Sequence, residues 1–243
     1  DLASQKITME KAPDVPIEYS YFYTTRKELD SLRFNAEKAE YDLKKQELKV
    51  SGIPYIIVAD AMITPENNQV LIHENARIGT LKNTTIVLDT LNAYHRLTNG
   101  VVDIVSRKEF TGSATYQYVN LLNDTFAIKM TDFRLEPVNS DGTQPKRHSV
   151  ASMQTVAKGS VNEQESLVLG AGMFYKGELT MYATRPALEL DRFIKLDIHS
   201  IPNYNTWIEY SQSGDETDIV LDYEKAVDEE GKRVTAGIHF SSA

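Results

Sequence analysis

The feature that most constrains the fold is a strict alternation of apolar and polar residues in the second half of the chain. From Met173 to Ala183 the odd-numbered positions are apolar or small, and Lys176, Glu178 and Thr180 occupy positions between them. Successive side chains of a β-strand point to opposite faces, so this pattern predicts a strand with one buried face.

A second run alternates in the same way. Its apolar face comprises Leu188, Leu190, Ile194, Leu196 and Ile198, and its polar face comprises Glu189, Asp191, Lys195, Asp197 and His199. Arg192 is the one exception to the pattern. Thr184-Arg185-Pro186 separates the two predicted strands as a turn, because proline cannot donate a hydrogen bond to a continuing ladder.

The first half of the chain has shorter runs rich in β-branched and aromatic residues, divided by Asn- or Gly-containing breaks. These runs are Val70 to Ile72, Thr85 to Leu88, Val101 to Val105, Ala114 to Val119 and Phe126 to Leu135. In the last run the apolar alternation shifts by one residue between Met130 and Phe133, which predicts a β-bulge. The sequence therefore predicts an all-β fold, either an elongated jelly roll or a stacked antiparallel sandwich, with at most one short helix.

One segment is compatible with two structures. Leu29, Leu32, Ala36, Ala39 and Leu43 have the spacing of a helical seam. The same stretch can form strands at Leu32–Ala36 and Ala39–Leu43, followed by a turn at residues 44–46 and a strand at Leu48–Val50. We favour the strands, because the seam is short and strand patterns surround it.

We expect an N-terminal connecting segment at residues 1–25, a first β module at 26–143 and a second at 144–243, unless the two modules form one continuous β-stack. The boundary is predicted from the turn-forming and basic residues between Pro137 and Ser149, where we expect an exposed loop. Near the C-terminus, Asp228 to Arg233 has the composition of a solvated hairpin turn. Because the chain begins with Asp1 and has no secretory signal there, we expect it to be a piece of a longer protein.

Composition excludes several classes of function. The chain has no cysteine, and therefore no disulfide, thiolate metal site or cysteine nucleophile. Its net charge of -9 opposes general attraction to nucleic acid or anionic lipid, both of which require a basic surface. No stretch approaches the ~20 apolar residues that cross a bilayer as a helix, so we expect no transmembrane segment.

We find no pattern that predicts catalysis. The five histidines never have metal-ligand spacing, and Gly170-Ala171-Gly172 precedes a strand and not a helix that could hold a phosphate. The acidic residues Asp215, Glu216, Asp218 and Asp222 could collect calcium ligands, but they lack the EF-hand spacing, and we interpret them as a solvated loop. We therefore predict no catalytic, cofactor-binding or metal-ligating residues, no cofactor and no enzyme activity.

Aromatic residues offer a second kind of site. Tyr19, Tyr21 and Tyr23 share one face of a predicted strand, and Tyr204 precedes Trp207. Such rows can form platforms on which sugars stack, but they also fill β-sheet cores, and we favour core or cross-strand packing.

Three stretches resemble a segment of very long cell-envelope proteins of Gram-negative bacteria. They are Gly52–Ala61 with Val70–Ile86, Tyr94–Tyr118, and Gln154–Gly159 with Phe174–Gly177. Asn35–Leu43 and Leu48–Gly52 more weakly resemble the OstA-like β-jelly-roll repeat of lipopolysaccharide-transport proteins. The resemblance implies a location in the periplasm or at the outer membrane, and supplies no catalytic residues.

We expect a non-catalytic structural or protein-binding β module of a larger envelope-associated protein, with other envelope proteins as its partners. The alternative is a carrier module that binds lipid or glycan. A continuous apolar groove would favour lipid, and an exposed row of Tyr and Trp would favour sugar.

Overall fold

The computed structural model describes residues 5–138, 152–165, 167–198, 205–213, 218–221 and 225–234. Within these ranges every strand pairs antiparallel with its neighbours, and the helical residues form only three-residue 3-10 turns. These turns are Ile17–Tyr19, Lys27–Leu29, Glu66–Asn68, Glu74–Ala76 and Glu163–Glu165. The predicted all-β fold is confirmed, with curled antiparallel sheets that form a half-barrel.

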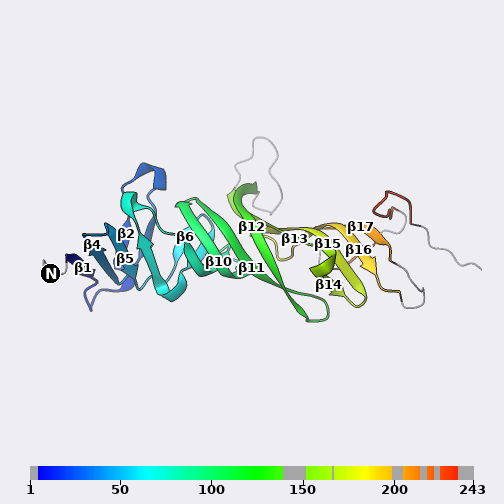
Figure 1. Ribbon diagram of the computed structural model, residues 1–243, viewed down its shortest axis with the longest axis horizontal. Coiled ribbons are helices and arrows are strands. Elements are labelled where there is room, and N and C mark those ends of the chain that lie inside the picture. Colours follow the sequence, from blue (N-terminus) through cyan, green and yellow to red (C-terminus); the bar gives the residue numbers. More distant parts are fainter. Residues whose placement is uncertain are drawn as a thin grey trace, which may run out of the picture.

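The largest sheet has eleven strands and extends along most of the elongated molecule (Figure 1). Its members are β6 (Ile56–Val58), β7 (Ala61–Thr64), β9 (Leu81–Leu88), β10 (His95–Ser106), β11 (Glu109–Val119), β12 (Thr125–Val138), β13 (Ser152–Val161), β14 (Leu167–Gly170), β15 (Met173–Tyr182), β16 (Glu189–Leu196) and β17 (Trp207–Gln212). The strand order is β17-β16-β15-β13-β12-β11-β10-β9-β7-β6, with β14 paired to β15. Most neighbouring strands in the sheet are consecutive in sequence and form hairpins. The order of the strands in the sheet therefore largely follows their order in the chain.

Two smaller sheets lie at the N-terminal end of the molecule (Figure 1). The first contains β1 (Lys6–Glu10), β4 (Lys38–Asp42), β5 (Glu47–Ser51) and β8 (Gln69–Ile72), in the order β1-β4-β5-β8. The second is a hairpin of β2 (Tyr21–Tyr23) and β3 (Arg33–Asn35). The segment that was compatible with helix or strands is therefore strands, β3 and β4, with a turn at residues 43–46 before β5.

The two alternating runs in the second half form β15 and β16, and their predicted faces are confirmed. Tyr175, Leu179, Met181, Leu190 and Ile194 are buried. The exception, Arg192, lies directly opposite Gly177 in the β15–β16 pairing. A Cβ atom at Gly177 would lie 2.6 Å from the Cβ of Arg192, so glycine is the residue that leaves room for this arginine.

The predicted bulge in β12 is also confirmed. The pairing of β12 with β13 shifts register between Thr131 and Arg134, and Asp132 adopts a φ of 53°. This extra residue is why Met130 and Phe133, three positions apart, both lie in the core.

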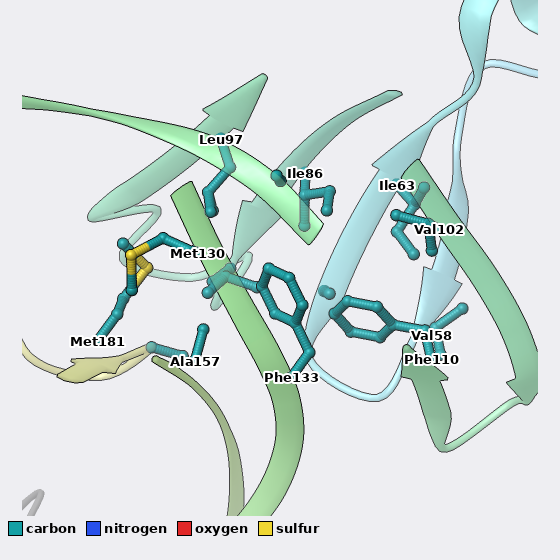
Figure 2. Packing of buried hydrophobic residues seen from close by; sticks show 14 of the residues in the cluster. Val58, Ile63, Ile86, Leu97, Val102, Phe110, Met130, Phe133, Ala157 and Met181 are labelled. Carbon is teal, nitrogen blue, oxygen red and sulfur yellow. The ribbon is translucent and has the colours of Figure 1, made fainter. Parts of the chain in front are cut away.

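One hydrophobic core runs through the curled sheets. Figure 2 shows its central part, in which the side chains from the N-terminal and C-terminal halves of the sheet pack against one another. Its labelled members are Val58, Ile63, Ile86, Leu97, Val102, Phe110, Met130, Phe133, Ala157 and Met181. In the described part of the chain, side chains therefore fill the concave side of the sheet.

The predicted division at residues 143 and 144 falls outside the described residues, as does most of the loop expected between Pro137 and Ser149. Its first two residues, Pro137 and Val138, belong to β12 and not to a loop. On either side of this gap β12 and β13 pair over most of their length, from Val138 with Ser152 to Met130 with Gly159. The division into modules stays a prediction. The predicted C-terminal hairpin turn is confirmed: the amide of Gly231 donates to the carbonyl of Asp228 at 2.9 Å, and its residues are exposed or half-buried.

Candidate functional site

Of the five histidines, His73 and His95 lie in the described residues, and His148, His199 and His239 lie outside them. His73 lies on the surface, with its Nδ1 atom 3.2 Å from a carboxylate oxygen of Glu47. His95 is fully buried, and its Nε2 atom lies 2.7 Å from the carbonyl oxygen of Arg185. No group of three or more His, Asp or Glu side chains in the described part of the chain could hold a metal ion.

The predicted acidic loop lies mostly outside the described residues, which include Asp218 but not Asp215, Glu216 or Asp222. The Gly-x-Gly segment connects β14 to β15. Gly172 has a φ of +65°, and its carbonyl accepts a hydrogen bond of 2.7 Å from the amide of Asp197. The described residues contain no helix long and apolar enough to cross a membrane.

A polar cluster lies inside the curl of the large sheet. Asp60, in the turn between β6 and β7, accepts a hydrogen bond of 2.8 Å from the amide of Thr155 and a second, short one from its hydroxyl. The neighbouring Gln154 accepts a hydrogen bond of 2.6 Å from the hydroxyl of Thr184. The bonds of Asp60 connect the β6–β7 turn to β13, two parts of the sheet that are not strand neighbours, and the bond of Gln154 connects β13 to the loop after its neighbour β15.

Burial changes the acidity of Asp60 in this cluster and of His95, whose partner Arg185 follows Thr184 in the chain. It raises the pKa of the Asp60 carboxyl above 3.8, although hydrogen bonds from Thr155 act in the opposite direction. It lowers the pKa of His95 below 6.5, partly offset by the carbonyls of Arg185 and Tyr182. The hydrogen bonds of Asp60 and Thr155 hold distant strands of the sheet together.

The tyrosine row departs from the sequence prediction. Tyr19, Tyr21 and Tyr23 are 76%, 57% and 66% exposed, so the prediction that they pack in the core is wrong. The core side of the β2–β3 hairpin is formed by Phe22 and Phe34, whose stacked rings lie 6.1 Å apart. Both faces of this hairpin are aromatic, and Tyr21 and Tyr23 occupy the outer one. Tyr19 lies in the 3-10 turn before β2, so the prediction that it shares a strand face with them is wrong.

Trp207 does pack as the sequence predicts. It is buried, and the amino groups of Lys176 and Lys195 lie 4.3 and 4.8 Å from the centre of its ring. Glu163 lies within 3.7 Å of both amino groups. Tyr204 lies outside the described residues.

No sequence pattern predicted the exposed edge strand β1. It ends its sheet, with β4 as its strand partner, and all five of its residues are exposed. Ile7 and Met9 pair with Tyr41 and Ala39 of β4, and are 49% and 47% exposed. Ala39 is fully buried, and Met9 lies opposite it, so Ile7 and Met9 are on the core face of the sheet. At this edge the core no longer covers them completely.

The hydrogen-bond alternation of an antiparallel pair fixes which backbone groups of β1 point outward. The amide of Leu43 donates to the carbonyl of Gln5 at 3.0 Å, and the amide of Lys11 donates to the carbonyl of Glu37 at 2.7 Å. Gln5 and Lys11 therefore direct backbone groups toward β4, and every second residue between them does the same. These residues are Ile7 and Met9. The amide and carbonyl groups of Thr8 and Glu10 therefore point away from the sheet.

Two of the other edge strands, β17 and β8, are partly covered by backbone hydrogen bonds. The amide of Glu209 in β17 donates to the carbonyl of Val227 at 2.9 Å, and the carbonyl of Leu71 in β8 accepts from the amide of Gly79 at 2.8 Å. Among the described residues, no backbone hydrogen bond covers the outer side of Thr8 or Glu10. An uncovered edge next to exposed apolar side chains can pair with another strand.

No protein-family model, curated protein or solved structure matches this chain.

Proposed function

We propose that the chain is a non-catalytic structural or protein-binding β module of a larger envelope-associated protein, and that it binds a partner protein by adding a strand along β1. The observation that carries the proposal is the combination of an uncovered backbone edge at Thr8 and Glu10 with the exposed apolar side chains of Ile7 and Met9. Strand addition uses both, because main-chain bonds give affinity and side-chain contacts on alternate residues give specificity.

The geometry of the edge favours a strand as the occupant. The outward amide and carbonyl groups repeat every second residue along β1. An extended chain has hydrogen-bonding groups at the same spacing, and a compact small molecule does not. A strand placed beside β1 would also bury Ile7 and Met9, each already about half covered, which would contribute about 1 kcal/mol per side chain. The neighbouring strand surface is mixed in charge, with ion pairs Lys6–Glu40 and Glu10–Lys38 on its other face.

The location and the partner class rest on the sequence resemblance to Gram-negative envelope proteins. We infer an extracytoplasmic site, in the periplasm or at the outer membrane, where the partners are other envelope proteins. The alternative of a lipid carrier has less support, because buried side chains pack together on the concave side of the described sheet (Figure 2).

The test introduces a photoreactive amino acid in place of Glu10 and crosslinks the protein in the cells that produce it. We expect a crosslinked protein band that is lost in Thr8→Pro, because proline removes the outward amide and leaves the bonds to β4 in place. Thr8→Ala is the matched control, since it changes the same side chain and keeps the amide. It should retain the band.

Two results would contradict strand addition at β1. The first is an absence of any crosslink at residue 10 in the unaltered strand. The second is a crosslink of equal yield in Thr8→Pro and Thr8→Ala, both shown to be folded by their melting temperatures, because such a contact would not depend on the outward amide.

A further inference from the structure

A second surface of the molecule has the features of a small-ligand site, and it lies apart from the β1 edge. A pocket of about 490 Å³ opens between the β2–β3 hairpin, β6 and the turn between β10 and β11. This volume is within the range of small-molecule sites. The side chains that give it chemical character are Tyr21, Tyr55, Arg33, Arg107, Glu18 and Asn35.

The hairpin register places the first group of these side chains. Tyr21 pairs with Asn35 and Tyr23 pairs with Arg33, so all four side chains share the outer face of the hairpin. The rings of Tyr21 and Tyr23 lie 6.1 Å apart with a tilt of 44°, and both are largely exposed. The hairpin therefore presents tyrosine rings and an arginine to solvent on one surface.

Hydrogen bonds hold the remaining walls in place. The amide of Arg107 donates to the carbonyl of Leu29 at 3.2 Å, and its carbonyl accepts from the amide of Ala59 at 2.8 Å. The side-chain amide of Asn35 donates to the carbonyls of Ile17 and Glu18, at 2.9 and 3.2 Å, which fixes the segment that carries Glu18. The backbone of the pocket is thus preformed, and a ligand would not have to order it.

The charges of the pocket are unusual for this chain. Acidic residues outnumber basic ones by 35 to 26, and surface cations such as Lys38 and Arg134 lie within 2.7 Å of carboxylates. Arg33 and Arg107 form no ion pair with any described residue. Two arginines without an ion-pair partner in the described part of the chain therefore line one pocket, together with the single carboxylate of Glu18.

We propose that this pocket binds an acidic saccharide, a pyranose sugar that carries a carboxylate. The exposed tyrosine faces suit the apolar C–H face of a sugar ring. Arginine binds a carboxylate through two parallel hydrogen bonds. Glu18 accepts hydrogen bonds from ring hydroxyls, and it leaves the pocket with a net charge of +1, which matches a monoanion and disfavours the second negative charge of a phosphate.

The test is isothermal titration calorimetry of the intact chain with an oligogalacturonate of four sugars. Its fully methyl-esterified form and maltotetraose serve as neutral probes, and inorganic phosphate and AMP serve as phosphate probes. We expect binding of the oligogalacturonate, and at least about tenfold weaker binding of its neutral ester, because the ester lacks the charge that the arginines contact.

The variants assign the binding to this pocket. Arg33→Gln combined with Arg107→Gln, and separately Tyr21→Ala, should each weaken binding of the oligogalacturonate by about tenfold or more. Arg96→Gln on β10 and Tyr94→Ala remove the same residue types from exposed positions outside the pocket and should bind as the unaltered protein does. A melting temperature within a degree or two of that of the unaltered protein would show that a variant folds.

Three outcomes would overturn the proposal. They are no binding of the oligogalacturonate at millimolar concentration, equal loss of binding in Arg96→Gln and in the double arginine variant, and tighter binding of AMP or phosphate than of the acidic sugar. None of these outcomes involves the β1 edge.

Discussion

The carboxylate of Asp60 and the backbone amide of Thr155 are separated by 95 residues in sequence and by 2.8 Å in the structure. Asp60 lies in the turn between β6 and β7, at one end of the large sheet, and Thr155 lies in β13, which is five positions from β7 and six from β6 in the sheet order. The bond can form only because the sheet curls back on itself. Thr155 is almost fully buried, so its amide has no access to water as a replacement partner.

We expect Asp60→Ala to lower the free energy of unfolding by about 1 to 3 kcal/mol, because the buried amide of Thr155 loses its acceptor. Thr155→Val removes the hydroxyl that also bonds Asp60, and keeps the amide. Urea unfolding of both single variants and of the double variant would measure their coupling. Strictly additive effects would show that the two residues do not interact in the folded protein.

The acidity of Asp60 predicts a pH dependence. Burial raises its pKa in the folded state above 3.8, so the folded state binds more protons than the unfolded state between these two values. The stability that protonation contributes is fully present below pH 3.8 and is lost as the pH rises through the folded pKa. Asp60→Asn cannot titrate, so its stability relative to the unaltered protein should increase over this range and then stay constant.

Unfolding curves of both proteins at several pH values above and below 3.8 would check this. If Asp60→Asn became less stable relative to the unaltered protein as the pH rose, the hydrogen bonds from Thr155 would outweigh burial, and the pKa of Asp60 would be lowered.

A further prediction concerns the buried face of β15. Leu179 is fully buried in the core, so Leu179→Asp should destabilise the protein by several kcal/mol, about 3 or more, since a charge would lie there without a partner. Glu178→Asp places the same residue type one position earlier, on the exposed face, and should change stability by less than about 0.5 kcal/mol. Thermal unfolding of both variants distinguishes the faces, and equal melting temperatures would contradict the assignment.

Local periodicity explains which parts of the fold were predictable. Three features depend on side chains that are close in sequence, and these were predicted. They are the faces of β15 and β16, the bulge between Met130 and Phe133, and the strands in place of a helix at residues 32–50. Asp60 and Thr155 were not predictable as a pair, because the curl that brings them together depends on the twist accumulated over many strands.

The tyrosine row was mispredicted for a different reason. Alternation shows that Tyr21 and Tyr23 share a face, and that Phe22 lies on the other, but it does not show which of two aromatic faces is covered. Phe34, which pairs with Phe22 on the adjacent strand, provides the larger apolar contact and directs that face into the core. The pocket arginines and the edge of β1 also depend on the arrangement of distant segments, and no local pattern identifies them.

The last prediction concerns His95, whose imidazole is fully buried against the ring of Tyr116, with centres 5.5 Å apart. Burial lowers its pKa in the folded state below 6.5, so between these two values the unfolded state binds more protons. The stability that the neutral imidazole contributes is present above pH 6.5 and is lost as the pH falls through the folded pKa. We expect the unaltered protein to lose stability relative to His95→Gln over this range, because glutamine can still donate to the carbonyl of Arg185 and does not titrate. Urea unfolding between pH 7.5 and about pH 5 measures this difference. His73→Gln is the control for loss of an imidazole from the surface; an equal change in its pH profile would show that the effect does not arise from the buried site.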